Sequence, residues 1–144
     1  MSGYNVQAVS TAPPGRVYDL LLDGGTWPRW SPIDSFESEG PTSDGSVGAV
    51  RVFTTGKNVT RERITHTDQN RSMSYEIITG SRLLLEYHGR IDLHPTHDGG
   101  TRIEWRATWR APFPGAGLLM ELYLRRFQQQ MVDGLARFAQ LGST

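Results

Sequence analysis

The amino-acid sequence predicts a single α+β domain in which a curved antiparallel sheet of seven strands wraps around a long C-terminal helix, with two short helices after the first strand. Two observations lead to this prediction. Between residues 33 and 111, apolar and polar residues alternate with a period of two, and clusters of Gly, Asn and Asp interrupt the alternation. After residue 115, apolar residues recur every three or four positions, as in a helix with one buried face. The length of 144 residues suits one domain with one core, spanning 1–144.

The first elements are a strand over residues 4–10 and a short helix that begins at the prolines of positions 13 and 14. Proline suits a first helical turn, because the N–H that it lacks has no partner there. Residues 23–25, Asp-Gly-Gly, end this helix. A second, very short helical turn carries Trp27 and Trp30, which are three residues apart and can cover one end of a core.

Six further strands are predicted in the alternating region. They run approximately over residues 33–39, 48–55, 59–66, 72–78, 82–93 and 101–111. In the last of them the buried face consists of Ile103, Trp105, Ala107, Trp109 and Ala111. In the strand over 82–93 the inward row consists of Leu83, Leu85, Tyr87, Gly89, Ile91 and Leu93, and the outward row begins at Leu84. Gly89 leaves a gap in the inward row, which permits strand curvature or the close approach of a ligand.

The final segment, residues 115–141, is predicted to be the long helix. Its core-facing stripe consists of Met120, Leu124, Phe127, Met131, Leu135 and Phe138. Gly134 costs this helix about 1 kcal/mol relative to alanine. We therefore expect it to allow close contact between the helix and the sheet.

Composition excludes several classes of function. Basic and acidic residues are equal in number at 15 each, which disfavours a nucleic-acid partner. The absence of cysteine excludes disulfides, thiolate metal sites and a cysteine nucleophile. No apolar run approaches the roughly 18 residues of a membrane span, so we expect no integral membrane contact and a cytoplasmic location.

Motifs for cofactors and metals are also missing. The sequence contains no Walker loop and no Gly-x-Ser-x-Gly elbow, and Gly115 to Gly117 lack the strand context of a dinucleotide site, so no cofactor is expected. His94 and His97 have a spacing that resembles a metal site, but the turn at 98–100 need not bring the two rings together. We expect no metal.

The order of the elements and several short segments resemble the SRPBCC superfamily, which includes START-type and Bet v 1-like proteins, and in particular its polyketide cyclase/dehydrase branch. The segments that carry the resemblance are residues 12–18 (Ala-Pro-Pro-Gly-Arg-Val-Tyr), 27–32 (Trp-Pro-Arg-Trp-Ser-Pro), 48 (Gly), 62–65 (Glu-Arg-Ile-Thr), 73–76 (Met-Ser-Tyr-Glu), 99–105 (Gly-Gly-Thr-Arg-Ile-Glu-Trp) and 131–135 (Met-Val-Asp-Gly-Leu). The resemblance implies a helix-grip fold with a deep, mostly apolar pocket that holds lipid-like, polyketide-like or other polycyclic molecules.

A strongly curved sheet cannot lie flush along a straight helix, so the space between them is either filled by side chains or left as a cavity. The residues predicted to contact a hydrophobic small molecule in such a cavity are Trp30, Glu62, Tyr75, Tyr87, Trp105, Trp109, Phe127 and Met131. The alternative, which the sequence leaves open, is that these side chains fill the core completely.

Glu62 is the one weak candidate for a catalytic residue. If Ile64 faces the core, so does Glu62, and a semi-buried carboxylate can bind a ligand hydroxyl or act as a general base. The alternative is an ion pair with an arginine at the sheet edge. Arg61 and Arg63 belong to the opposite face, which weakens a cyclase mechanism that uses an inward arginine. The sequence does not assign the faces of Arg51 and Arg82.

Three functions remain compatible with the sequence. The first is binding of a hydrophobic small molecule, and the second is a cyclase-like enzyme, for which no complete catalytic constellation is present. The third is a ligand-responsive regulatory domain with lids at residues 26–34 and 41–46. The sequence identifies neither the ligand nor the oligomeric state, although an edge strand at 4–10 or 33–39 could pair in a dimer.

Overall fold

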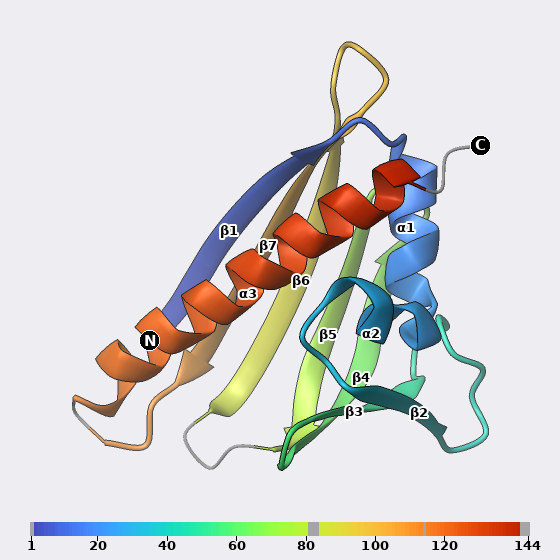
Figure 1. Cartoon of the computed structure of the whole chain (residues 1–144). Coiled ribbons are helices and arrows are strands. Elements are labelled where there is room, and N and C mark those ends of the chain that lie inside the picture. The colour runs from blue at the N-terminus through green and yellow to red at the C-terminus, as the bar shows by residue number, and fades with distance from the viewer. Residues whose placement is uncertain (1, 81–83, 114, 142–144) are drawn as a thin grey trace.

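In the computed structural model, which describes residues 2–80, 84–113 and 115–141, all seven predicted strands form one antiparallel sheet. The strands are β1 (Ser2–Ser10), β2 (Ser35–Glu39), β3 (Val50–Thr55), β4 (Asn58–Asp68), β5 (Ser72–Thr79), β6 (Leu85–Pro95) and β7 (Thr101–Arg110). Their order in the sheet is β1-β7-β6-β5-β4-β3-β2, so β2 to β7 form a meander and β1 adds to its end. The predicted fold class is confirmed (Figure 1).

The helices are α1 (Pro14–Leu22), the 3-10 turn η1 (Gly24–Thr26), α2 (Trp27–Trp30) and α3 (Ala116–Leu141). Pro14 occupies the first position of α1, and Asp23 ends it with an N–H bond to the carbonyl of Asp19. Figure 1 shows α3 crossing the concave face of the sheet beside β1, with α1 and α2 near its C-terminal end. The sheet thus grips one long helix.

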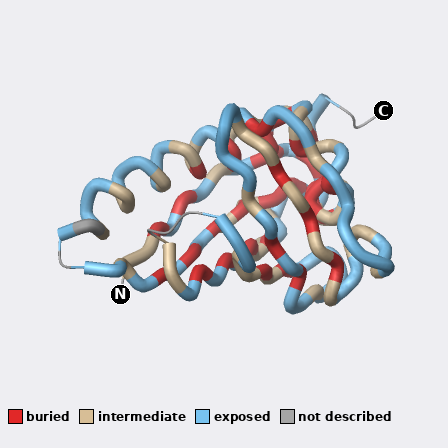
Figure 2. Tube along the Cα trace, turned by 90° about the horizontal axis from the view of Figure 1, so that it is seen from below, coloured by how far each residue is buried: buried red, intermediate tan, exposed pale blue. Residues whose placement is uncertain are grey.

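The core lies between the second half of α3 and the centre of the sheet. The alternation predicted for β7 is confirmed, because its odd-numbered residues from Thr101 to Trp109 are all buried. The second half of α3 contributes Met131, Leu135 and their buried neighbours, whereas Leu118 and Leu119 in the first half are 66% and 76% exposed. Figure 2 shows the same change along the helix. Only one half of α3 is therefore firmly packed.

Gly134 lies at a close approach of α3 to α2. A Cβ atom at this position would overlap the backbone carbonyl oxygen of Trp30. The glycine thus permits contact with α2, and the prediction that it permits contact with the sheet is wrong. Packing of the helix remains the physical reason for a glycine here.

A bulge alters the predicted rows of β6. Glu86 has a φ of 53°, and the register between β6 and β7 shifts between Leu85 and His88. This irregularity lets Leu84 pack partly buried against the core, so the prediction that Leu84 faces outward is wrong. The predicted start of this strand, at Arg82 and Leu83, lies outside the described residues.

Other strand boundaries also differ from the prediction. The predicted strand over 48–55 begins only at Val50, because Gly48 has a φ of 92° and lies in the preceding turn. The strand predicted from residue 33 begins at Ser35. None of the helices in the described part of the chain has the length and apolar character that a bilayer-spanning helix needs.

Candidate functional site

A cavity of about 560 Å³ lies between the concave face of the sheet and the first half of α3. The sheet supplies lining residues from β3 to β7, and α3 supplies residues along one stripe. The lining comprises Trp27, Ile33, Phe53, Thr55, Lys57, Asn58, Val59, Thr60, Glu62, Tyr75, Ile77, Gly80, Leu84, Tyr87, Trp105, Met120, Tyr123, Leu124, Phe127, Gln128 and Met131.

The cavity exists because α3 is straight and the sheet is curved. The second half of the helix packs against α2 at Gly134, whereas its first half lies along β1, where Glu121 accepts from the N–H of Gly3 at 3.2 Å, and faces the other strands across the cavity. Met120, Leu124 and Phe127, which the helical stripe predicts to face inward, are therefore only partly buried and line the cavity. The predicted stripe is confirmed, and its two halves have different roles.

A cluster of aromatic rings closes the end of the cavity near α2. Trp27 stacks on Phe53 with ring centroids 4.6 Å apart, and its edge meets Trp105 at 5.6 Å. Trp30 lies behind Trp27, at 5.1 Å, and donates its indole N–H to the hydroxyl of Thr26. The two tryptophans thus cover one end of the core, as the sequence predicts, but Trp27 rather than Trp30 contacts the cavity.

Two buried tyrosines, Tyr75 and Tyr87, line the sheet side of the cavity, and Tyr4 lies behind them, outside the lining. The hydroxyls of Tyr4 and Tyr87 are hydrogen-bonded, and Trp105 donates its indole N–H to the hydroxyl of Tyr75 at 2.9 Å. Burial, reinforced by the neighbouring hydroxyls, raises the pKa of Tyr4 and Tyr75 well above the usual value. Burial likewise raises the pKa of Tyr87 to about 12. All three phenols therefore stay protonated, and those of Tyr75 and Tyr87, which line the cavity, can donate hydrogen bonds to a ligand.

Glu62 lies on the inward face of β4, as predicted, and only 5% of it is exposed. Burial raises the pKa of its carboxyl from 4.5 to about 7, although the Arg51 guanidinium lowers it and Asp44 raises it further. Within the described residues its Oε1 has no hydrogen-bond partner and it forms no ion pair. Among the described residues, Glu62 therefore does not form the ion pair with an edge arginine that the sequence left open. Arg82 lies outside the described residues.

Arg51, whose face the sequence does not assign, is fully buried opposite Glu62 in the pairing of β3 with β4. Its Nε donates to Asp44 at 2.8 Å and its Nη2 donates to the carbonyl of Leu21 at 2.8 Å. The guanidinium also lies 5.2 Å from the Trp27 ring centroid. Arg51 therefore forms its ion pair with Asp44, and it acts on the carboxyl of Glu62 through its charge alone among the described contacts.

Gln128 is a lining residue that sequence reasoning missed. It is 7% exposed, and no group in the described part of the chain bonds its Oε1. The signal was available, because position 128 lies four residues after Leu124 and three before Met131, inside the apolar stripe. A polar residue at such a position requires a partner.

Six of the eight residues predicted to contact a ligand line the cavity. These are Glu62, Tyr75, Tyr87, Trp105, Phe127 and Met131. The structure does not bring Trp30 and Trp109 to it. Trp109 is fully buried, and its ring stacks on Tyr87 with the centroids 5.9 Å apart. The contact roles of all eight residues stay predictions.

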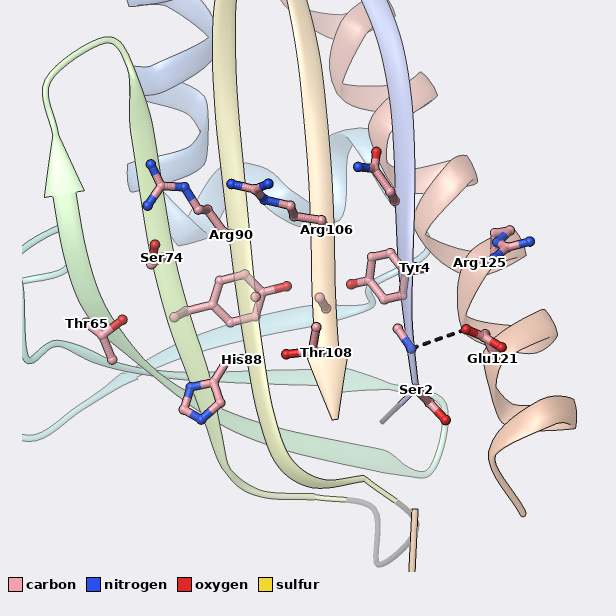
Figure 3. Close-up of a pocket in the computed structure, with 15 residues that line it drawn as sticks. Ser2, Tyr4, Thr65, Ser74, His88, Arg90, Arg106, Thr108, Glu121 and Arg125 are labelled. Atoms are coloured by element: carbon pink, nitrogen blue, oxygen red, sulfur yellow. Dashed lines mark hydrogen bonds between the residues drawn. The ribbon is translucent and has the colours of Figure 1, made fainter. Parts of the chain in front are cut away.

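A second, more open depression of about 680 Å³ extends from the outer side of the sheet to Glu121 and Arg125 of α3 (Figure 3). Its labelled side chains are mainly polar, among them Ser74, His88 and Thr108. Arg90 and Arg106 share the carboxylate of Asp92 at 3.0 and 3.1 Å. This surface does not suit an apolar ligand.

The two predicted lid segments and His94 make contacts with other parts of the fold. The buried side chains of Trp27, Trp30 and Ile33 anchor the segment 26–34, and Asp44 holds the loop 41–46 by accepting from the N–H of Gly24 at 2.8 Å. His94 lies 3.0 Å from Glu104. Among residues 2–80, 84–113 and 115–141, no group of three or more metal-ligating side chains occurs.

Three solved structures have the same fold. Ara h 8.0201 is 18% identical with a TM-score of 0.78, and the match covers 97% of this chain and 98% of that one. XoxI from Bacillus cereus is 19% identical with a TM-score of 0.77, over 99% and 97% of the two chains. A protein from Nitrosospira multiformis is 22% identical with a TM-score of 0.73, over 94% of each. No curated protein matches the chain in sequence.

The family model described as polyketide cyclase / dehydrase and lipid transport matches residues 3–140, which is nearly the whole chain. The helix-grip architecture of the sheet and α3 agrees with that match, and so does the resemblance that the sequence segments carry. The chain is therefore a member of the polyketide cyclase / dehydrase and lipid transport family, within the SRPBCC superfamily.

Proposed function

We propose that the protein binds a hydrophobic or polycyclic small molecule in the cavity between the sheet and α3. The observation that carries this proposal is an internal volume of about 560 Å³ with a lining rich in aromatic and methionine side chains. Small-molecule sites commonly have volumes of roughly 300 to 1,000 Å³, mostly apolar walls and a few polar groups. The family and the fold are consistent with this kind of ligand.

The chemistry of the walls favours flat and variable ligands. The faces of Tyr75, Tyr87 and Phe127 can stack on rings, whereas Met120 and Met131 can adjust their rotamers to different shapes. The exposed lining residues Lys57, Asn58, Val59 and Tyr123 mark where a ligand would pass between the β3–β4 turn and α3.

Native mass spectrometry of the purified protein tests the proposal, followed by extraction and a thermal-shift screen with fatty acids, flavonoids and aromatic polyketides. We expect a co-purifying molecule or a saturable rise in Tm. If the spectrum contains no adduct and no compound changes the Tm, the cavity is not a ligand site and the proposal is wrong.

A second candidate is a cyclase-like enzyme, which the environment of Glu62 favours. A carboxyl with a pKa of about 7 can exchange a proton at neutral pH. It would take a proton from a carbon beside a ligand carbonyl, while the hydroxyl of Tyr75 or Tyr87 donates to the resulting enolate oxygen. In this case Glu62→Gln abolishes turnover of the ligand but keeps its binding. Unaltered turnover in the variant removes Glu62 from this role.

A further inference from the structure

Two buried polar side chains reach the cavity from opposite walls. Glu62 comes from β4 in the sheet, and Gln128 comes from α3. Each is more than nine-tenths buried. In both, Oε1 lacks a hydrogen-bond partner among the residues that the structure describes. Both side chains thus line the same cavity, and each has one buried oxygen without a hydrogen-bond partner among the described residues.

Such atoms are unusual in folded proteins. Buried polar side-chain atoms nearly always have a partner, because an unpaired one keeps the full cost of its lost hydration. The other polar groups of the floor bond one another, as Trp105 bonds Tyr75. Glu62 and Gln128 are therefore buried positions of the lining at which a ligand can add hydrogen bonds without breaking any between described residues.

The ligand group that fits both positions is a hydroxyl. A hydroxyl both donates and accepts, so it pairs with Glu62 in either protonation state and with either end of the Gln128 amide. A saturated hydrocarbon would leave both side chains unpaired. A ligand carboxylate at Glu62 would meet a group whose neighbouring cation, Arg51, is already bound by Asp44 at 2.8 Å.

Building on the proposed binding function, we propose that the cavity selects a neutral ligand with two hydroxyl groups at separate positions of an apolar ring system, one bonded to Glu62 and the other to Gln128. The aromatic and methionine walls hold the ring system between these two points. The class comprises dihydroxylated polycyclic and polyphenolic molecules.

The test compares matched pairs of probes by isothermal titration at pH 6. The pairs are estradiol and estra-1,3,5(10)-triene, 2,6-dihydroxynaphthalene and naphthalene, and a dihydroxyflavone and flavone. Palmitate and pyrene serve as probes without a hydroxyl. We expect the diol of at least one pair to bind about tenfold or more tightly than its parent, since each hydrogen bond to a buried polar group contributes about that factor.

Variants connect this preference to the two side chains. Glu62→Leu and Gln128→Leu should each reduce the ratio of diol to parent affinity about tenfold, mainly by strengthening binding of the parent. Glu62→Gln keeps a polar partner and should retain the ratio. Gln130→Leu, a leucine substitution on the same helix at an exposed position, is the matched control and should leave the ratio unchanged.

The outcomes separate this inference from the function on which it rests. If palmitate or pyrene binds but no diol exceeds its parent, the hydroxyl selectivity is wrong and the binding function stands. Diol preference that survives both leucine substitutions also overturns the assignment. If no probe binds the wild-type protein and none co-purifies, the binding function itself fails.

Discussion

The ring of Tyr75 lies over Gly89, its cross-strand partner on β6, in the space that a Cβ atom at Gly89 would occupy. The gap that the sequence predicts in the inward row is therefore filled by a tyrosine ring. This contact fixes a side chain of the cavity floor whose hydroxyl accepts from Trp105. A glycine on one strand thus positions a polar group on the next.

Replacing Gly89 with alanine should displace the Tyr75 ring. We expect the free energy of unfolding to fall by about 2 kcal/mol, because a methyl group would be forced against a ring that has little room to move. Urea unfolding measures the change. Gly15→Ala is the control, since a Cβ there lies 3.5 Å from the nearest atom, in Asn70, and alanine favours the helix. Equal stability of Gly89→Ala and the wild type would contradict this packing.

Trp109 should behave as a core residue and not as a cavity residue. Trp109→Ala is expected to lower the free energy of unfolding by about 3 to 5 kcal/mol, the cost of truncating a large buried ring. Trp109→Phe keeps an aromatic ring against Tyr87 and should lose much less. Chemical unfolding and ligand titration on the same variants separate the two roles. A small loss of stability with a large loss of affinity would place Trp109 in the binding site.

The pH dependence of stability reports on Glu62. Its pKa is about 7 in the folded protein against an ordinary 4.5, so the folded state holds this proton more tightly. The stabilisation that comes from the tighter proton binding of folded Glu62 is fully present below about pH 4.5, and it is lost as the pH rises through 7. Glu62→Gln stays neutral throughout, so the wild type should lose about 3 kcal/mol relative to it between pH 5 and 8.

Charged and titratable groups from several elements face Glu62. Comparing the wild type with Glu62→Gln separates the titration of Glu62 from the titration of those groups. Arg51 lies on β3, Asp44 in the loop before it, and Tyr75 on β5. All are present in both proteins, so their own titrations cancel in the difference. Urea unfolding at several pH values gives that difference. Parallel pH profiles for the wild type and Glu62→Gln would show that the carboxyl is not perturbed.

The sequence predicted the sheet, α3 and most of the cavity walls because alternation and helical spacing report directly on burial. The face of Glu62 followed from Ile64 in this way, and six of eight proposed contacts line the cavity. Trp109 belongs to the same inward row as Trp105 but lies elsewhere along the strand, and alternation does not locate the end of a cavity.

Other features were not predictable from a period of two. The bulge at Glu86, where φ is 53°, accompanies the turn of Leu84 toward the cavity. The alternation of apolar and polar side chains does not predict such a bulge. The ion pair of the buried Arg51 with the partly buried Asp44 joins β3 to a loop seven residues earlier, so it depends on the path of that loop. Gln128 is different, because its place in the apolar stripe was visible and its significance was missed.

The central claim is that a ligand occupies the space beneath the first half of α3, and a pair of helix variants tests it most directly. Leu124→Trp places a large ring in the cavity, whereas Leu119→Trp places the same ring on a position that is 76% exposed. Titration with 1-aminoanthracene, a neutral apolar fluorophore, should show saturable binding to the wild type and Leu119→Trp and none to Leu124→Trp. Equal binding to both variants, or to neither variant nor the wild type, would contradict the claim.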